Sequence, residues 1–355
     1  MEKKYIYNCA YILGSISIFL YLVKGPLVFL ILFYFFSLFG FFSEKISKKN
    51  LFLFTLSFLL ISLFGFFNVN FKDNEYYLTI FSFISCIGTA LLLFRSSSSV
   101  NLTKYHYIFF ALYVCFFIYQ YAFIDPELYN NIFASSSRNI VSAYLNLLLI
   151  SYVISCYRFN VPPSIFLPLF NIFICFFLYG RTGIVLSIFL LLTIFIKFFY
   201  SKINLFICIF FVIFVFLGYS IVEFYFLEKT GFVQGTISER SIVFNEYVSS
   251  LNDYKNIIFG SNVYNCCSYL ASLSFNLHNS FLYAHSRFGL VGVLFVVGLF
   301  VLIFKSKNIL YITLFLLICF RYFYDQLGFF QIFDVTLFYL LISVLNISKN
   351  TNYKV

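Results

Sequence analysis

Long apolar runs separated by short polar turns dominate this chain. The runs are near the roughly 20 residues that a helix needs to cross a bilayer. They are continuously apolar rather than alternating, which favours spanning helices over the strands of a membrane barrel. We predict twelve helices, at residues 5–23, 25–42, 51–67, 77–94, 106–124, 140–156, 164–179, 183–199, 205–222, 281–304, 309–324 and 332–347. The expected fold is an all-α polytopic membrane protein.

Composition supports a membrane protein and argues against a nucleic-acid partner. Hydrophobic residues make up 62% of the chain and charged residues only 10%, whereas a soluble domain carries about 25% charged residues. The formal net charge is +10, but the Lys and Arg residues stand singly between apolar runs. This spacing is typical of cytoplasmic turns rather than of one basic soluble face. We expect the lipid bilayer, and no nucleic acid, as a partner.

The distribution of basic residues predicts an orientation. If both termini are cytoplasmic, fourteen of the 23 Lys and Arg residues fall on that side, in line with the positive-inside bias. These fourteen are Lys3, Lys4, Lys45, Lys48, Lys49, Arg95, Lys104, Arg158, Lys197, Lys202, Lys305, Lys307, Lys349 and Lys354. The first apolar run lacks a small-residue cleavage site, so we interpret it as a spanning helix. We therefore expect a multi-pass membrane protein with both termini in the cytoplasm.

One long polar connection divides the chain into three segments. Residues 1–222 would form an N-terminal bundle of about nine helices, and residues 281–355 about three helices and a cytoplasmic tail. Residues 223–280 would form a long external loop between them, on the side opposite the termini. Loops of this length usually have a function of their own.

The long loop is expected to contain an amphipathic helix from Ser238 to about Tyr254. Ser238 suits an N-cap, and Arg240 heads an apolar stripe. The stripe consists of Phe244, Tyr247, Val248 and Leu251. Two interpretations stay open: a helix that lies on the membrane surface with Arg240 turned toward the protein, or a helix packed in a small subdomain.

Cysteine spacing predicts neither a metal site nor a disulfide framework. Seven of the nine cysteines lie inside apolar runs, where they are expected to be small buried residues. Cys266 and Cys267 are in the polar loop, and adjacent cysteines pair only with strain. The sequence has no nucleotide-binding or metal-binding motif, so we expect no metal and no cofactor.

The segment Gly180-Arg181-Thr182-Gly183 is the first candidate for chemistry. It places an arginine between glycines at the start of a helix, where backbone N–H groups and the helix dipole favour an anion. Arg binds phosphate groups bidentately, so the segment suits a phosphate or pyrophosphate. The alternative is an interfacial arginine that reaches the lipid headgroups.

A histidine where the long loop re-enters the membrane is the second candidate. His278 stands beside Asn279 and near Arg287, and a neutral imidazole there is able to accept a proton from a sugar hydroxyl. The alternative is a structural histidine. His106, at the predicted cytoplasmic start of a helix, is expected to be interfacial only.

Other charged residues lie close to helix ends. Arg138 and Asn139 start a predicted helix and would bind an anion or cap the helix. Arg321 and Asp325 are four residues apart, which predicts an ion pair. Asp334 has no partner that the sequence identifies.

Several of these motifs occur in a fixed order between residues 130 and 305. They are Ser137-Arg138-Asn139-Ile140-Val141-Ser142-Ala143, then Gly180-Arg181-Thr182-Gly183, the loop with Arg240 and Ile257-Ile258-Phe259-Gly260, His278-Asn279-Ser280-Phe281-Leu282, and Gly289-Leu290-Val291-Gly292. In order and topology this set resembles the bacterial O-antigen polymerase and O-antigen ligase superfamily.

The resemblance implies a metal-independent glycosyltransferase of lipopolysaccharide biosynthesis. Such an enzyme joins oligosaccharide repeat units linked to undecaprenyl pyrophosphate at the periplasmic face. Arg181 and Arg240 would hold the pyrophosphate, and His278 would activate or orient the acceptor. The remaining implied substrate contacts are Arg138, Asn139, Asn279 and Arg287.

Rival functions differ in their need for the long loop. An O-antigen ligase would use the same motifs, but the Phe-rich composition favours a polymerase, which varies with its sugar repeat. A flippase for lipid-linked oligosaccharides has no reason for such a loop, and a secondary transporter would show paired broken helices. A chain-length regulator is a further candidate partner.

Overall fold

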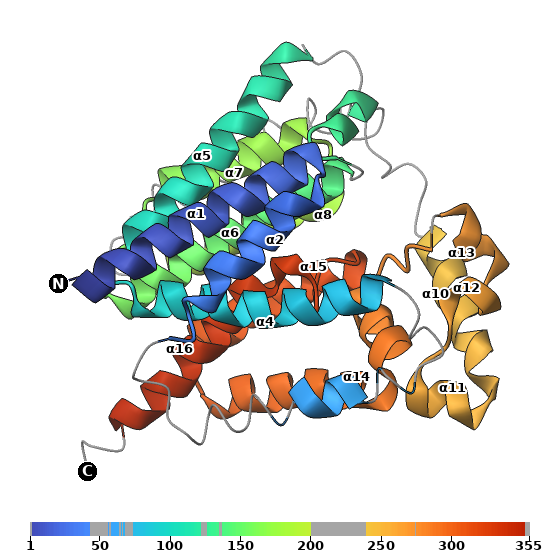
Figure 1. Ribbon diagram of the computed structural model, residues 1–355. Helices are drawn as coiled ribbons and strands as arrows, with labels where there is room; N and C mark the ends of the chain where they lie inside the picture. Colours follow the sequence, from blue (N-terminus) through green and yellow to red (C-terminus); the bar gives the residue numbers. More distant parts are fainter. Residues whose placement is uncertain are drawn as a thin grey trace. The chain divides into compact units, whose positions relative to one another are not determined.

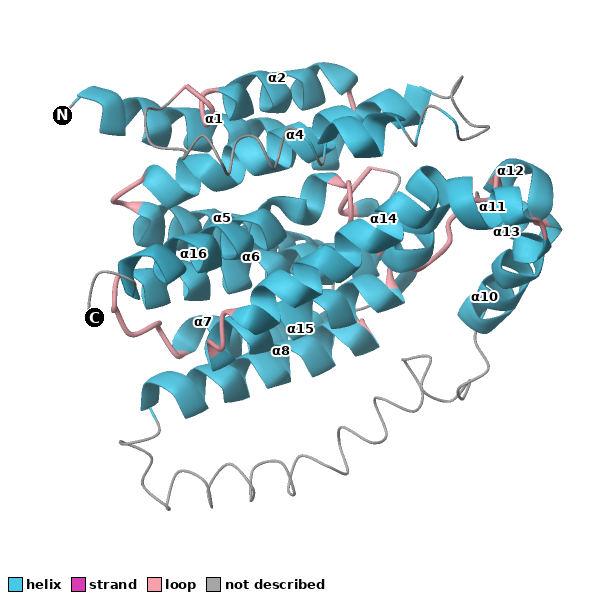
Figure 2. Cartoon of the chain, turned by 90° about the horizontal axis from the view of Figure 1, so that it is seen from below, coloured by secondary structure: helices cyan, strands magenta, loops and turns pink. Residues whose placement is uncertain are grey.

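The computed structural model describes a helical chain. The described residues are 2–42, 56, 58–63, 65, 67, 74–121, 126–134, 137–199, 239–273 and 275–351. Within these ranges every regular element is a helix, and no strand is drawn in Figure 2. The predicted helix 205–222 and the first part of the long loop, 223–238, lie outside the described residues, and the predicted helix 51–67 is described only in part. The all-α prediction is confirmed for the described residues.

Six described helices are long and apolar enough to cross a membrane. They are Tyr5–Lys24, Tyr76–Arg95, Ser99–Gln120, Arg138–Arg158, Arg181–Phe199 and Ser280–Lys305. Four more predicted spans are apolar helices of 10–17 residues, namely Leu27–Leu38, Phe166–Phe177, Ile309–Tyr324 and Ile332–Asn346. These helices are consistent with a membrane-embedded protein, whereas the number twelve and the orientation stay predictions.

The chain folds into two compact units. Unit 1 comprises residues 1–102 and 239–355, and unit 2 comprises residues 103–238. The predicted segments 1–222, 223–280 and 281–355 were defined by expected membrane topology, whereas these units are defined by packing. The units therefore do not test the predicted segments. Each unit is described by itself below.

Unit 1 contains long helices from both ends of the chain. They are α1 (Glu2–Lys24), α2 (Leu27–Leu38), α4 (Asn74–Arg95), α14 (Ser280–Lys305), α15 (Ile309–Tyr324) and α16 (Val335–Thr351), the last preceded by the 3₁₀ turn η6 (Ile332–Asp334). The predicted turn Lys24-Gly25-Pro26 joins α1 to α2, which pack together. Helix α4 contacts α1, α2 and α16, and α14 contacts α15 and α16. Unit 1 therefore packs N-terminal helices against C-terminal ones.

A group of short helices lies at the start of α14 in unit 1 (Figure 1). They are α10 (Glu239–Ser249) with the turn η5 (Ser250–Asn252), α11 (Tyr254–Phe259), α12 (Val263–Cys266) and α13 (Ser268–Ser272). We call residues 239–273 the loop subdomain. Helix α11 packs directly against α14, which attaches the subdomain to the bundle.

Unit 2 is built around one buried helix. Its elements are most of α5 (Ser99–Gln120), η1 (Pro126–Asn131), α6 (Arg138–Arg158), α7 (Phe166–Phe177), α8 (Arg181–Ile194) and the π-helical turn η2 (Phe195–Phe199). Residues Val141 to Cys156 of α6 are buried without interruption, on every side of the helix. An apolar helix without a polar face is expected in the centre of a bundle, and α6 contacts both α7 and α8.

Candidate functional site

Two arginines of unit 1 share one carboxylate. Nη2 of Arg321, in α15, lies 2.7 Å from Oδ2 of Asp325, and Nη2 of Arg240, in α10, lies 3.6 Å from Oδ1 of the same carboxylate. The predicted Arg321–Asp325 ion pair is thus confirmed. Two guanidinium groups and one carboxylate leave a net charge of +1 in this cluster.

The members of this cluster differ in exposure. The Arg321 side chain is 0% exposed and that of Asp325 8% exposed, whereas 32% of the Arg240 side chain is exposed. The Arg240 guanidinium also lies 5.7 Å from the centre of the Tyr324 ring, within the range of a cation–π contact. Arg321 therefore anchors the carboxylate, and Arg240 presents the positive charge to the surroundings.

Residues 277–283 and 325–332 lie beside this cluster, and we call them the rim segments. The two rim segments are joined by hydrogen bonds. The side-chain oxygen of Gln326 accepts a hydrogen bond of 2.9 Å from Leu277 N. Ser280 Oγ donates to Asp325 O at 2.7 Å and accepts from the N–H groups of Leu327 and Gly328, both at 2.9 Å. These bonds fix the start of α14 against the connection between α15 and α16.

His278 stands in the first rim segment, between two anchored neighbours. Leu277 is buried, and the Asn279 side-chain oxygen caps α14 by accepting from the N–H groups of Phe281 and Leu282 at 2.8 and 3.1 Å. His278 itself has φ +50°, in the left-handed region, and its N–H donates to Asn276 Oδ1. Asn279 thus has a structural task in addition to its predicted contact with substrate.

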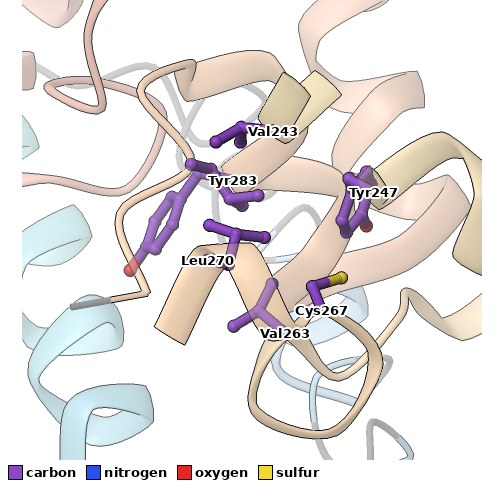
Figure 3. Packing of buried hydrophobic residues seen from close by; sticks show 7 residues of the cluster. Val243, Tyr247, Val263, Cys267, Leu270 and Tyr283 are labelled. Atoms are coloured by element: carbon purple, nitrogen blue, oxygen red, sulfur yellow. The ribbon is translucent and has the colours of Figure 1, made fainter. Parts of the chain in front are cut away.

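The loop subdomain has an apolar core of its own (Figure 3). The buried residues of this core are Val243, Tyr247, Val263, Cys267, Leu270, Leu277 and Tyr283. In Figure 3 their side chains gather around Leu270, and the hydroxyl of Tyr283 points away from the group. Of the two interpretations of the loop helix, the structure has the helix packed in a small subdomain.

The predicted stripe on that helix is partly wrong. Tyr247 is fully buried as expected, but Phe244 and Val248 are 45% and 44% exposed, and Val243 takes their place in the core. The residues of the pair Val243 and Tyr247 are four positions apart, as are those of the pair Phe244 and Val248. Periodicity alone therefore does not show which pair is buried. The packing of α10 against α12 and α13 selects Val243 and Tyr247.

His285 connects the loop subdomain to α14. Its Nε2 lies 2.9 Å from Ile257 O and its Nδ1 lies 2.8 Å from the Tyr247 hydroxyl. Because a carbonyl oxygen only accepts, Nε2 donates to Ile257, and in the neutral imidazole Nδ1 accepts from Tyr247. Burial raises the pKa of Tyr247, so this hydroxyl keeps the proton that it donates. His285 joins α10 and α11 to α14, a role that the sequence analysis missed.

Two glycines bring α11 and α14 into backbone contact. Gly260 ends α11 with φ +90°, and Gly289 kinks α14 with φ +56°. A Cβ on Gly260 would overlap the carbonyl oxygens of His285 and Ser286, and a Cβ on Gly289 would overlap that of Ile258. Only glycine fits at both positions.

Arg287 and Glu246 both have structural partners in unit 1. Arg287 is 4% exposed, and its guanidinium lies 5.6 Å from the centre of the Tyr283 ring. Glu246 caps α13, because its carboxylate accepts from the N–H groups of Tyr269 and Leu270 at 2.9 and 3.1 Å. Glu246 therefore has a structural task in the loop subdomain, and the predicted substrate contact of Arg287 stays a prediction.

Asp334 organises the second rim segment. Its carboxylate accepts from the N–H groups of Phe329, Phe330 and Gln331 at 3.0, 2.6 and 3.0 Å, and from the Tyr322 hydroxyl at 2.9 Å. Phe329 and Phe330 have φ values of +53° and +80°, which are unfavourable for bulky residues. Asp334, which the sequence left without a partner, holds this turn in place.

In unit 2, Arg138 starts α6 within a small polar network. Its Nη1 lies 3.3 Å from Glu127 Oε1, and its N–H donates to Asn130 Oδ1 at 2.9 Å. Asn130 Nδ2 in turn donates to Glu127 Oε2 at 2.6 Å. Ser137, not Arg138, is the N-cap of α6, and the Arg138 guanidinium is paired with Glu127 instead.

The start of α8 lies against the start of α6. Arg181 is the first residue of α8, and a Cβ on the preceding Gly180 would lie 3.2 Å from both Asn139 Oδ1 and Ser142 Oγ. A Cβ on Gly183 would lie 2.6 Å from Ser142 Oγ. The glycines of the predicted 180–183 motif therefore bring two helix N-termini together, where N–H groups favour an anion.

Below these helix starts, unit 2 contains a buried polar network that the sequence analysis missed. Asn171 Nδ2 donates to Asn146 Oδ1 and to Ser187 Oγ, both at 2.9 Å. Asn146 Nδ2 donates to Ser142 O at 2.9 Å, and Ser187 Oγ lies 2.7 Å from Gly183 O. Such bonds join helices in apolar surroundings, and single Asn and Ser residues in the apolar runs were the available signal.

Two findings concern the cysteines and metals. Cys266 and Cys267 form a disulfide in the loop subdomain, although their adjacency disfavours pairing. Among the described residues no group of His, Cys, Asp and Glu has the arrangement of a metal site.

The described part of the chain is helical, has six helices long and apolar enough to cross a membrane, and carries a subdomain of short helices that packs against α14. No family model, curated protein or solved structure matches the chain. The function therefore has to be argued from the residues themselves.

Proposed function

We propose that this protein is an O-antigen polymerase of the bacterial inner membrane. It would join undecaprenyl-pyrophosphate-linked oligosaccharides at the periplasmic face, with both termini in the cytoplasm. The observation that carries the proposal is the partly exposed Arg240 guanidinium, held by Asp325 next to the segment that contains His278.

The chemistry requires a positive charge at the leaving group. When the bond between the anomeric carbon and the pyrophosphate oxygen breaks, negative charge develops on that oxygen. Arg240 is fixed by an ion pair and a ring contact, so it stabilises this charge without reorganising. Loss of one preorganised donor of this kind lowers the rate by about 10²–10³-fold.

His278 is the residue that we assign to the acceptor hydroxyl. A neutral imidazole is able to take the hydroxyl proton near neutral pH as the glycosidic bond forms. The φ of +50° at His278 supports this role, because strained backbone positions concentrate at functional sites. Glu246, an acidic residue of the loop subdomain, caps α13 instead.

The starts of α6 and α8 offer a second anion site, within unit 2. Arg181 and the N–H groups of α8 are suited to a phosphate group, as the sequence analysis predicts. Arg138 is a weaker candidate, because it is already paired with Glu127. We therefore keep Arg181 as a proposed contact with the lipid pyrophosphate and test it separately.

Deletion of the gene tests the function against its rivals. If the protein is a polymerase, lipopolysaccharide from the deletion strain carries core with a single repeat unit. A ligase or a flippase would leave core without any repeat, and an unchanged ladder of chain lengths on a gel would reject all three functions. An epitope tag inserted next to Tyr254, which is 67% exposed, should be accessible from the periplasm.

Point variants in the complemented strain test the residues. Arg240→Ala and His278→Ala should abolish long chains while the protein still accumulates in the membrane. Lys255→Ala is the matched control, because Lys255 is an exposed basic residue of the same subdomain. Normal ladders from Arg240→Ala and His278→Ala would remove both residues from the mechanism.

A further inference from the structure

A cavity of about 260 Å³ lies inside unit 1, beside the rim segments. Helices α1, α2 and α4 contribute the other walls. The polar side chains that line it include Tyr21, Tyr34, Thr79, Ser82, Tyr283 and Gln326. Its volume is just below the roughly 300–1,000 Å³ of sites for drug-sized ligands, so one ring-sized group fits.

We propose that this cavity binds an uncharged sugar ring of the lipid-linked oligosaccharide, an inference that rests on the proposed function. None of its lining residues is ionised. Aromatic rings offer an apolar surface to the C–H face of a sugar, and hydroxyl and amide groups are able to donate to and accept from its hydroxyls. The lining combines both kinds of group, in tyrosines, a serine, a threonine and two glutamines.

Other ligands fit this lining less well. A pyrophosphate requires cationic partners, which lie outside the cavity at Arg240 and Arg321. A divalent cation requires carboxylates, and none lines the cavity. A lipid acyl chain would displace water from the hydroxyl and amide groups without replacing its hydrogen bonds, which is unfavourable.

Two pairs of hydroxyl groups supply the polar contacts. Tyr34 Oη lies 2.9 Å from Ser82 Oγ, and Tyr283 Oη lies 3.0 Å from Thr79 Oγ1. A hydroxyl both donates and accepts, so each pair is able to rearrange around a sugar hydroxyl. Tyr283 also belongs to the core of the loop subdomain, and its hydroxyl points away from that core (Figure 3). The cavity and the subdomain therefore share this side chain.

The cavity wall is held in place by groups that do not line it. Asp334 fixes the turn that contains Phe330 and Gln331, and Cys86 Sγ donates to Gln331 O at 3.3 Å. Gln326 follows Asp325 directly in the chain, so the wall continues into the cluster that carries Arg240. A sugar in the cavity would thus lie next to the segment whose Asp325 holds Arg240, where we place the pyrophosphate.

Sugar binding by the purified full-length protein tests this assignment. The protein is kept in a detergent without a sugar headgroup, and saturation-transfer NMR is recorded with glucose, galactose and N-acetylglucosamine as probes. Inorganic pyrophosphate is titrated as a separate probe. The variants are Tyr34→Phe combined with Ser82→Ala, which removes one hydroxyl pair, and Ser82→Leu, which fills the cavity. Ser85→Ala is the matched control, a buried serine of α4 outside the cavity lining.

We expect at least one sugar to bind the wild type and the Ser85→Ala control. The double variant should weaken that binding roughly tenfold, as loss of hydrogen bonds to a ligand does, and Ser82→Leu should abolish it. Pyrophosphate binding should persist in both cavity variants. The proposal is wrong if no sugar binds, or if Ser82→Leu binds sugar as the wild type does. Failure of the polymerase proposal is seen separately, in the ladder of the deletion strain.

Discussion

Nη2 of Arg240 lies 3.6 Å from Oδ1 of Asp325, whose other oxygen forms an ion pair with the buried Arg321. The position of the exposed arginine thus depends on an ion pair that is itself buried. Removing a partner from a buried pair leaves a charge without compensation, which costs about 3–5 kcal/mol. Pairs exposed to solvent contribute only about 0–1 kcal/mol.

The first prediction contrasts Asp325→Asn with Arg240→Ala. Asp325→Asn leaves Arg321 buried without its carboxylate, so the purified protein should unfold at a clearly lower temperature. Arg240→Ala keeps the Arg321–Asp325 pair, so its unfolding temperature should stay near that of the wild type while polymer synthesis is lost. The unfolding temperatures of the two variants are measured by size-exclusion chromatography after heating, and polymer synthesis is measured from the ladder of chain lengths. Equal destabilisation by the two variants would contradict the assignment of Arg321 as the structural partner of Asp325 and of Arg240 as the substrate contact.

The second prediction concerns Gly260 and Gly289. Alanine at either position combines a backbone conformation that disfavours side chains with an overlap against a carbonyl oxygen. Both variants should loosen the loop subdomain from α14, and limited proteolysis should then cut within residues 239–273. Gly298→Ala is the control on the same helix, because a Cβ there has nothing within 4 Å. Equal protease resistance of all three variants would show that the contact does not hold the subdomain.

The third prediction concerns Asp334. Asparagine has one acceptor oxygen and an NH₂ group in place of the second one, so Asp334→Asn loses bonds to the N–H groups of the 329–331 turn. A buried N–H group left without an acceptor costs about 1–3 kcal/mol. Asp334→Asn should therefore destabilise the protein much more than Tyr322→Phe, which removes one hydroxyl donor only. Comparable unfolding temperatures for the two variants would mean that the turn does not depend on the carboxylate.

The sequence predicted well what depends on neighbours along one helix. The apolar run 77–94 corresponds to α4, at Asn74–Arg95, because a spanning helix needs a continuous run of fixed length. The Arg321–Asp325 pair follows from a spacing of four residues, which places both side chains on one face of a helix. One of the two interpretations turned Arg240 toward the protein, but it placed the helix on the membrane surface, whereas the structure packs this helix in the loop subdomain.

Contacts made by an irregular turn, or between segments far apart in the chain, could not be predicted in this way. The partners of Asp334 are N–H groups of a turn, and nothing in residue spacing indicates that a turn will present three of them. Both ring nitrogens of His285 contact residues of the loop subdomain, 28 and 38 positions away. The choice of Val243 over Phe244 likewise depends on helices that pack against α10.

The fourth prediction concerns Gly183 and Ser142, where α8 meets α6. Gly183→Ala would place a methyl group 2.6 Å from Ser142 Oγ and 2.8 Å from Ser142 Cβ, closer than packed atoms allow. The variant should therefore be destabilised and should displace Arg181 at the start of α8. Ser142→Gly removes both of those atoms, so Gly183→Ala combined with Ser142→Gly should recover much of the lost stability.

This double variant also separates the role of Arg181 from that of its surroundings. If Arg181 binds the pyrophosphate, Arg181→Ala abolishes long chains without lowering the unfolding temperature, because the residue is at a helix start and only partly buried. Gly183→Ala would lower both stability and chain length, and Ser142→Gly would restore both together. Long chains from Arg181→Ala would show that the arginine has no part in the reaction. The glycines would then serve only to pack α8 against α6.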